Sequence, residues 1–451
     1  MGNAAPGATL LILGMNQWIP MDKPESKPQI SEEERKSQRP LYANQTVTNL
    51  SNGLAMPFIP YYVTRLGATS VELGLLQAFR NLFPNIMQYP WGKLSDRLRA
   101  RVPFLIVGGW ISSIMFLLIA YSASPFQLIL LAAVQSFAMS MMIPTWSALL
   151  GDMVSKGNRG YVFSRIMIFA MAAGLVGNVL AGVLLITGDP NATDVYRYPF
   201  IAAMVLGILA TVFLFRVKPR TKTQEGEEEV ASGKWARRKD FYNLLALQLF
   251  YMFFMSMLWP LMPRTIVDVV HANNFEIVLL TVIGSVSILA TQSRVGKLQD
   301  RVGPAVLIKL SRFLLVPVPL VYAFATEMWH LYLLNIVAAV GIAIINISFT
   351  TYLLDVSPSG RTAEYFAVYN TGVGIVTFVG SVSAGFLADY LTGLHGLWMG
   401  LFVIYMISTF GRFIGSFFFL RLKPSDKYPE TLSEALPRIS RFLSIPRGGW
   451  R

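Results

Sequence analysis

The sequence predicts an all-α polytopic membrane protein whose twelve transmembrane helices form two pseudo-symmetric six-helix bundles. Three observations predict this fold: apolar blocks long enough to cross a bilayer, basic residues in alternate loops, and motifs that recur in the second half. Hydrophobic residues make up 54% and charged residues 14% of the 451 residues, whereas soluble domains carry about a quarter charged residues. Lipid offers no hydrogen-bond partners to the backbone, so each apolar block is expected to be a helix.

The apolar blocks are separated by polar, glycine or proline breaks. In the first half they cover residues 41–63, 70–91, 103–122, 125–150, 161–187 and 198–217. In the second half they cover residues 241–262, 274–293, 304–325, 330–354, 363–388 and 396–420. Each block approaches the roughly 20 residues that span about 30 Å of hydrocarbon.

Polar segments divide the chain into five parts. An N-terminal tail, 1–40, precedes the first bundle, 41–217. A charged linker, 218–240, separates it from the second bundle, 241–421. The chain closes with a polar tail, 422–451. Both tails and the linker are expected to be cytoplasmic.

Basic residues predict the orientation of the chain in the membrane. One set of loops, which includes the linker, also holds Lys93, Arg97, Arg99, Arg101, Lys156, Arg159, Arg294, Lys297, Arg301 and Arg361. The other loops hold only Arg65, Arg197 and Arg264. Because positive loops face the cytoplasm, we expect both termini there, with the protein in the cell membrane. Topology then explains the net charge of +13, and nucleic-acid binding is not expected.

Three short motifs recur at an offset of 203 or 204 residues, each in the corresponding helix of its half. They are Gly92-Lys-Leu-Ser-Asp96-Arg97 with Gly296-Lys-Leu-Gln-Asp300-Arg301, Leu149–Asp152 with Leu353–Asp355, and Gly177–Gly182 with Gly380–Gly385. Internal repeats of this kind are typical of transporters built from duplicated bundles. The sequence therefore predicts two copies of one six-helix unit.

The motif at 92–101 is predicted to lie in the short loop after the second span. It resembles the loop signature of the major facilitator superfamily, Gly-x-x-x-Asp-Arg-x-Gly-Arg-Arg, and the copy from Gly296 to Gly303 matches its first eight positions. The first copy departs from the pattern, with Arg99 in place of Gly and Ala100 in place of Arg. The resemblance covers residues 41–421 and implies alternating access to a central site.

The same resemblance assigns a gating role to six residues of the two motif copies. They are Gly92, Asp96, Arg97, Gly296, Asp300 and Arg301. Glycine permits close helix approach, and an aspartate at a helix end can sit against the N-terminus of a helix in the other half and pair with arginine. The alternative is that these charges only set the topology.

Two further family patterns are incomplete. Helix 5 carries Gly174 and Gly177-Asn178-Val-Leu-Ala181-Gly182, which is similar to part of an antiporter signature but is expected to serve helix packing. Helix 4 has Ala132 three residues before Gln135, where many proton-driven drug exporters have arginine. No carboxylate is placed at mid-membrane, so the coupling ion and the direction of transport stay open.

A polar seam crosses the first two spans at mid-membrane depth. Arg80 is expected to be the one charge at mid-membrane depth. It lies near the middle of 70–91, where a cation costs at least ~2.5–3.5 kcal/mol on insertion scales. The same helix carries Gln77, Asn81, Asn85 and Gln88 at helical spacing, and the first span carries Gln45, Asn49 and Asn52. One hypothesis is a site for an anionic or polar solute at Arg80, Asn81, Gln77, Asn49 and Asn52. The alternative is that Arg80 only binds helix carbonyls or asparagines as packing.

Other polar residues inside the predicted spans are weaker candidates for the solute-binding site. Gln135 on helix 4 and Asn346 on helix 10 are included because the family fold places those helices around the central cavity. Arg412 on helix 12 is expected to extend its charge towards the membrane surface.

The chemistry of the chain favours a transporter over an enzyme. It contains no cysteine, and its three histidines lie in or beside external loops without metal-ligand spacing. We expect a secondary active or facilitative transporter of a small solute, monomeric and without a cofactor. Multidrug or metabolite efflux and a non-transporting sensor on the same fold are the alternatives. Met1, Met15 and Met21 remain alternative start sites.

Overall fold

The computed structural model describes most of the two bundles. The described residues are 32–98, 100–154, 159–186, 189, 192–217, 238–358, 361–424, 434–435 and 437. Most of the predicted tails and linker therefore lies outside the described residues. One difference concerns the first span, because its helix begins at Glu32, inside the predicted tail.

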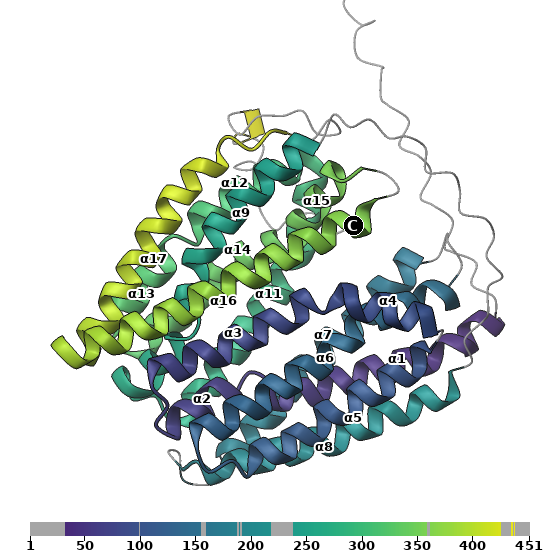
Figure 1. The fold of residues 1–451 in the computed structure, drawn as a ribbon, viewed down its shortest axis with the longest axis horizontal. Helices are drawn as coiled ribbons and strands as arrows, with labels where there is room; N and C mark the ends of the chain where they lie inside the picture. Colours follow the sequence, from purple (N-terminus) through teal and green to yellow (C-terminus); the bar gives the residue numbers. More distant parts are fainter. Residues whose placement is uncertain are drawn as a thin grey trace, which may run out of the picture.

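The helices follow the predicted spans in order (Figure 1). The first half contains α1 (Glu32–Ala55), α2 (Ile59–Arg65), α3 (Ser70–Ile86), α4 (Gln88–Leu98), α5 (Arg101–Ala120), α6 (Pro125–Met153), α7 (Arg159–Ile186), η2 (Asp194–Tyr196), α8 (Arg197–Val212) and η3 (Phe213–Arg216). The second half contains α9 (Arg238–Leu258), α10 (Met262–Arg264), η5 (Thr265–Val269), α11 (Asn274–Val302), α12 (Pro304–Leu314), α13 (Pro317–Phe324), α14 (Met328–Ile344), η6 (Ile345–Phe349), α15 (Thr350–Val356), α16 (Thr362–His395) and α17 (Leu397–Phe419).

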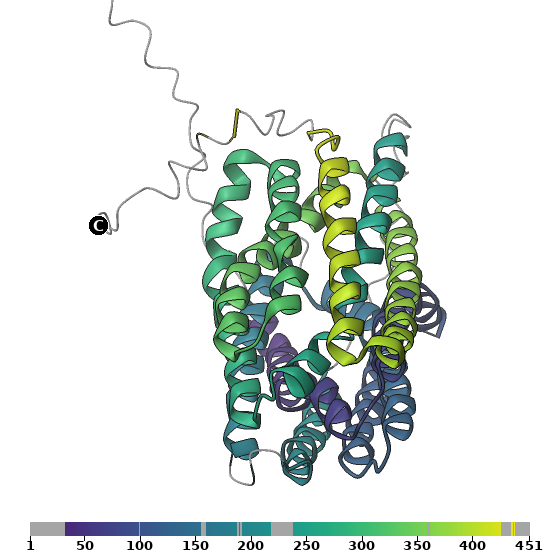
Figure 2. The same cartoon turned by 90° about the vertical axis from the view of Figure 1, so that its left-hand side faces the viewer.

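The predicted fold class is confirmed. Ten helices within the described ranges are long and apolar enough to cross a membrane. The two remaining spans, α1–α2 and α3–α4, are broken near prolines and carry the polar seam. Figures 1 and 2 show the helices of the first half gathered on one side and those of the second half on the other.

Prolines break the first span of each half at equivalent places. Pro57 lies between α1 and α2 and Pro260 between α9 and α10, whereas Pro60 and Pro263 lie in the first turn of α2 and α10. Proline has no N–H, so the carbonyl four residues earlier loses its helical partner. A neighbouring helix supplies a donor for one such carbonyl in the second half, where the Ser381 hydroxyl lies 3.1 Å from the Ser256 oxygen.

Glycines allow α1 and α7 to touch backbone to backbone. A Cβ placed on Gly53 would overlap the carbonyl oxygen of Gly174, and a Cβ on Gly177 would overlap that of Leu50. In α16, a Cβ on Gly380 would lie 2.6 Å from the Phe253 oxygen of α9. The small-residue runs therefore pack helices within each half, and their last glycines, Gly182 and Gly385, pack against Val278 and Ser70 of the other half.

The two halves meet mainly along α3 with α16 and along α7 with α11. α3 and α16 run side by side across the front of Figure 1. We call one end of the bundles the basic face, which carries the helix ends Leu98, Met153, Val302 and Val356. The other end, the opposite face, carries Ser70, Ala120, Asn274 and His395.

Two sequence-based expectations about basic residues are wrong. The signature residues Gly92 to Arg97 lie within helix α4 and not in a loop, because the helix continues past the apolar block to Leu98. Arg412 does not extend to the membrane surface. It is 1% exposed and donates hydrogen bonds to the carbonyls of Leu315 and Met255, each at 3.1 Å.

Candidate functional site

Arg80 on α3 points to the break in the first span. Its Nη2 lies 3.2 Å from the carbonyl oxygen of Met56, the acceptor that Pro60 deprives of a backbone donor. Within the described part of the chain this is the one hydrogen bond of the Arg80 side chain, and no carboxylate pairs with it. The side chain remains partly exposed. A guanidinium has five N–H donors, so most of its donor capacity is unused.

The other polar residues of α3 bond mostly along their own helix. Gln77 Nε2 donates to Asn81 Oδ1 at 3.2 Å, and Asn85 Nδ2 donates to the Asn81 carbonyl at 2.7 Å. The Asn81 Nδ2 group is buried without an acceptor. Gln88, the first residue of α4, reaches the other half, because its Oε1 accepts a hydrogen bond from Asn370 at 3.4 Å. The seam therefore contains donors at Arg80 and Asn81 that lack acceptors in this conformation.

The α1 part of the seam lies just before the break. Asn49 Nδ2 donates to the carbonyl of Gln45 at 2.9 Å. Asn52 lies one turn before Met56, whose N–H bonds to the Asn52 carbonyl at 2.9 Å. The bond from Arg80 to Met56 thus joins the two polar helices one turn after Asn52.

Gln135 and Asn346 are placed differently. Gln135 is 2% exposed and donates to the Ser112 carbonyl of α5 at 3.1 Å, so its amide joins α6 to α5 and not to the seam. Asn346 lies in the other half, in the π-helical segment η6, and its side chain is exposed. π-Helical turns occur frequently at functional sites. No hydrogen bond between described residues links either side chain to Arg80.

Arg312 was not among the predicted site residues, although it is a charge inside the apolar block 304–325. Its side chain is fully buried, and Nη2 donates to Gln248 Oε1 at 2.7 Å. Its guanidinium carbon lies 4.5 Å from the ring centre of Tyr251 and 4.6 Å from that of Phe419. Aromatic faces stabilise a desolvated cation. Together with Arg412, this overturns the expectation that Arg80 is the single charge at depth.

The signature of the first half forms an ion-pair network at the basic face. Arg101 lies 3.2 Å from Asp96 and also pairs with Asp152 at the end of α6. Arg97, which the sequence analysis placed in this role, is exposed. Side chains next to each other on a helix point in different directions, so Arg101, after the turn, reaches Asp96 more readily.

The two signature glycines, Gly92 and Gly296, do not pack closely against a neighbouring helix. A Cβ on Gly92 would meet only the Cβ of Pro144, at 3.7 Å, and a Cβ on Gly296 would have nothing within 4 Å. Asp300 is exposed. The hydrogen bonds of Asp96 and Arg101 stay within the first half. The signature thus makes none of its described polar contacts to the second half in this conformation.

The fold defines a class: two pseudo-symmetric six-helix membrane bundles with a polar seam at mid-depth. The family model of the Major Facilitator Superfamily matches residues 41–244 and again 244–447. The chain therefore belongs to the Major Facilitator Superfamily, and its two matches coincide with the predicted repeat.

Individual relatives agree with this assignment. The multidrug resistance protein MdtG of Serratia proteamaculans (strain 568) is 25% identical over 407 residues, covering 86% of this chain and 94% of the relative. The crystal structure of the nucleoside transporter NupG is similar with a TM-score of 0.65 at 12% identity, covering 86% of this chain and 98% of that one. The D-xylose-proton symporter gives a TM-score of 0.65 at 14% identity, with coverage of 88% and 99%.

The family and its members define the biochemical class. The protein is a membrane transporter of a small solute and not an enzyme. The similar proteins handle drugs, nucleosides and a sugar by their names, so the fold alone does not select a substrate.

Proposed function

We propose that the protein moves an anionic or polar organic solute by alternating access, with Arg80 as the charge that binds it. The observation that carries the proposal is the state of Arg80. It is a cation at mid-membrane with one carbonyl partner, no carboxylate among the described residues and a partly exposed side chain. Intramembrane charges that packing does not consume commonly mark substrate pathways.

The neighbours of Arg80 fit an acceptor-rich ligand. Asn81 holds a buried amide donor without an acceptor, and Gln77 is bonded to Asn81 on the same helix. Asn49 and Asn52 approach from α1. Asn346 extends the site to the second half, because an exposed amide in the middle of a span fits a water-filled cavity better than lipid.

Multidrug or metabolite efflux is the second candidate. The similarity to MdtG favours it, whereas Ala132 replaces the arginine of the common proton-driven drug exporters. A lipophilic cation would also be repelled by Arg80. The charge of the bound solute therefore separates the two proposals.

We also propose that the basic face is cytoplasmic, that both termini lie there and that the protein acts as a monomer in the cell membrane. The bias of lysine and arginine towards one set of loops supports the orientation. A single chain supplies both bundles, so no second copy is needed to form the site. The same charge distribution argues against a nucleic-acid partner.

A thermal-shift screen against a panel of organic anions, neutral metabolites and cationic drugs tests the proposed substrate class. Solutes that bind the native state raise its melting temperature. We expect anionic compounds to stabilise the wild type and to lose this effect in Arg80→Gln, which keeps a donor for Met56 but removes the charge. Arg197→Gln, a charge change at a half-exposed site, is the control and should keep the shift.

Two outcomes would overturn the proposal. Stabilisation by anions that persists in folded Arg80→Gln would exclude Arg80 as the substrate charge. Stabilisation by cationic drugs alone would favour efflux of drugs. Uptake of a stabilising anion into proteoliposomes would then separate a transporter from a sensor, which binds without accumulating it.

A further inference from the structure

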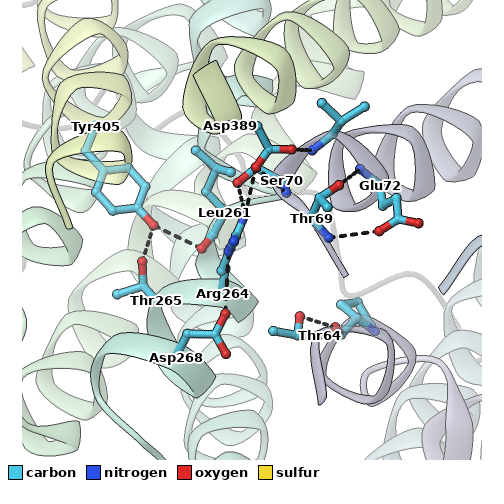
Figure 3. Close-up of polar contacts among 12 residues, drawn as sticks. Thr64, Thr69, Ser70, Glu72, Leu261, Arg264, Thr265, Asp268, Asp389 and Tyr405 are labelled. Atoms are coloured by element: carbon cyan, nitrogen blue, oxygen red, sulfur yellow. Dashed lines mark hydrogen bonds and ion pairs between the residues drawn. The ribbon is translucent and has the colours of Figure 1, made fainter. Parts of the chain in front are cut away.

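A carboxylate of the second half lies against the first turn of a helix in the first half. Asp389, near the end of α16, accepts hydrogen bonds from the backbone N–H groups of Ser70 and Val71, each at 2.8 Å (Figure 3). Arg264 of α10 lies 2.9 Å from the same carboxylate and also donates to the Ser70 hydroxyl. One carboxylate thus joins α3, α10 and α16 at the opposite face.

The helix dipole, free backbone N–H groups and a partly buried ion pair all strengthen the contact of Asp389 with α3. The N-terminus of α3 carries the positive end of the helix dipole and unpaired N–H groups. Thr69 and Glu72 form a capping box that satisfies other donors of the same turn, and Asp389 takes the donors of Ser70 and Val71. The Arg264 and Asp389 side chains are 15% and 26% exposed. Such a partly buried, charge-assisted network is stronger than an isolated surface pair.

The register of α3 and α16 relates this contact to the signature. The two helices run antiparallel, with Ser70 bonded to Asp389 and, further along, Gln88 bonded to Asn370. A step forward along α3 is therefore a step backward along α16. If the same register continued along α4, it would place Asp96 opposite the first turn of α16, at Thr362. Asp389 near the end of α16 thus faces the N-terminus of α3. In this register Asp96, near the end of α4, corresponds in the same way to the N-terminus of α16.

Only one of these two aspartates is docked in this structure. Asp389 contacts the first half, whereas Asp96 is 61% exposed on its side chain and bonds to Arg101 within its own half. Other bonds between the halves also lie at the opposite face. Arg65 donates to the Ala272 carbonyl at 2.7 Å, and Tyr196 donates to Asn274 Oδ1 at 2.9 Å.

We propose that Asp389, held by Arg264 on the first turn of α3, is the gate residue of the opposite face and the counterpart of Asp96. The pair formed by α3–α4 and α16 is then a latch with two ends, of which one is docked at a time. Release of Asp389 opens the opposite face and lets Asp96 reach α16. This inference rests on the proposed alternating access.

The chain contains no cysteine, so reporters can be placed in the otherwise unaltered protein. Val278 of α11 packs against Gly182 of α7 near the opposite face and is 8% exposed. A cysteine at this position should react slowly with a membrane-impermeant maleimide. In Asp389→Asn we expect its labelling rate to rise by about tenfold, the effect of a moderate population shift. Nitroxides at Lys93 and Glu364, at the basic ends of α4 and α16, should move closer.

The control is Asp194→Asn, which removes a carboxylate paired with arginine inside the first half at the same face. It should leave labelling at the wild-type rate. If Asp389→Asn does not yield folded protein, Arg264→Gln tests the same contact from its other side. An unchanged labelling rate in a folded latch variant would overturn the role of Asp389.

A combined variant shows whether an unchanged labelling rate means that Asp389 is not the gate residue or that the protein does not alternate between two conformations. Asp389→Asn with Arg65→Gln and Asn274→Ala weakens or removes the polar contacts that these three residues make between the halves at the opposite face. If the combined variant exposes the cysteine but Asp389→Asn does not, only the latch is wrong. If the cysteine stays protected even in the combined variant, the proposed opening of this face is wrong as well.

Discussion

Arg80 donates a hydrogen bond to the carbonyl of Met56, the acceptor that Pro60 leaves without a backbone partner. The same relationship holds for Arg412, which donates to the carbonyl of Leu315, the acceptor four residues before Pro319. In lipid an unpaired carbonyl costs several kcal/mol. Side chains of neighbouring helices therefore make the proline breaks tolerable.

The bond between Arg80 and Met56 predicts a coupling between Arg80 and Pro60. Arg80→Ala should destabilise the protein by about 1–3 kcal/mol, the cost of a buried acceptor without a donor. With Pro60→Ala, an N–H returns to the helix, and the added cost of Arg80→Ala should fall. Thermal unfolding of the double-mutant cycle in detergent measures the coupling. Strict additivity would show that this hydrogen bond does not stabilise the fold.

The buried position and hydrogen bonds of Arg412 predict that this residue stabilises the fold and does not take part in transport. Arg412→Leu should lower the free energy of unfolding by about 3–5 kcal/mol, because it leaves two buried carbonyls without their charged donor. Arg421→Leu removes an exposed arginine and should change stability by only about 0.5 kcal/mol. Melting temperatures of the two variants provide the comparison. Equal values would contradict the buried position of Arg412.

The close contact of Gly53 in α1 with α7 predicts that a larger side chain at this position destabilises the protein. A methyl group there would overlap the Gly174 backbone, so Gly53→Ala should cost about 1–3 kcal/mol through overpacking. Gly393→Ala, in a helix where a Cβ meets nothing within 4 Å, should be neutral or stabilising by up to about 1 kcal/mol. Thermal melts of both variants test the prediction, and a stable Gly53→Ala would show that the helices separate easily.

Arg101 and Arg97 predict different effects on transport. Arg101 joins Asp96 to Asp152, so Arg101→Gln should slow uptake at least about tenfold if this network sets the balance of the two conformations. Arg97→Gln changes an exposed side chain and should have less than about a twofold effect. Initial uptake rates in proteoliposomes, corrected for the amount of protein, compare the two. A larger loss in Arg97→Gln would return the gating role to Arg97.

Most of the fold followed from the sequence, because span length, the repeat and the polar seam are local patterns. The repeat of the signature also led to the correct family. The partners of the buried arginines did not follow. An arginine within an apolar block is visible in the sequence, but its acceptor lies on another helix. The acceptor of Arg412 is the carbonyl of Leu315, which is free because Pro319 lacks an N–H, and the acceptor of Arg312 is the side chain of Gln248.

The partners of Asp389 and Asp96 could not be predicted from the sequence either. Asp389 stands near the end of its span, where a carboxylate is unremarkable, and its importance arises from the antiparallel register of α3 and α16. The pairing of Asp96 with Arg101 depended on the helix extending to Leu98. Both relationships are set by tertiary geometry and not by spacing along the chain.

The polarity of the first two spans has a consequence for how the protein is made. These spans precede the others in the chain, yet they fall outside the ten helices of the described residues that are long and apolar enough to cross a membrane. α1 packs on α7, and α3 packs on α16, which is synthesised near the end of the chain. The contact of α3 with α16 therefore forms only late in translation, after the contacts of α3 within the first half. We therefore expect a chain truncated before α16 to leave this face of α3 uncovered and to be removed by quality control.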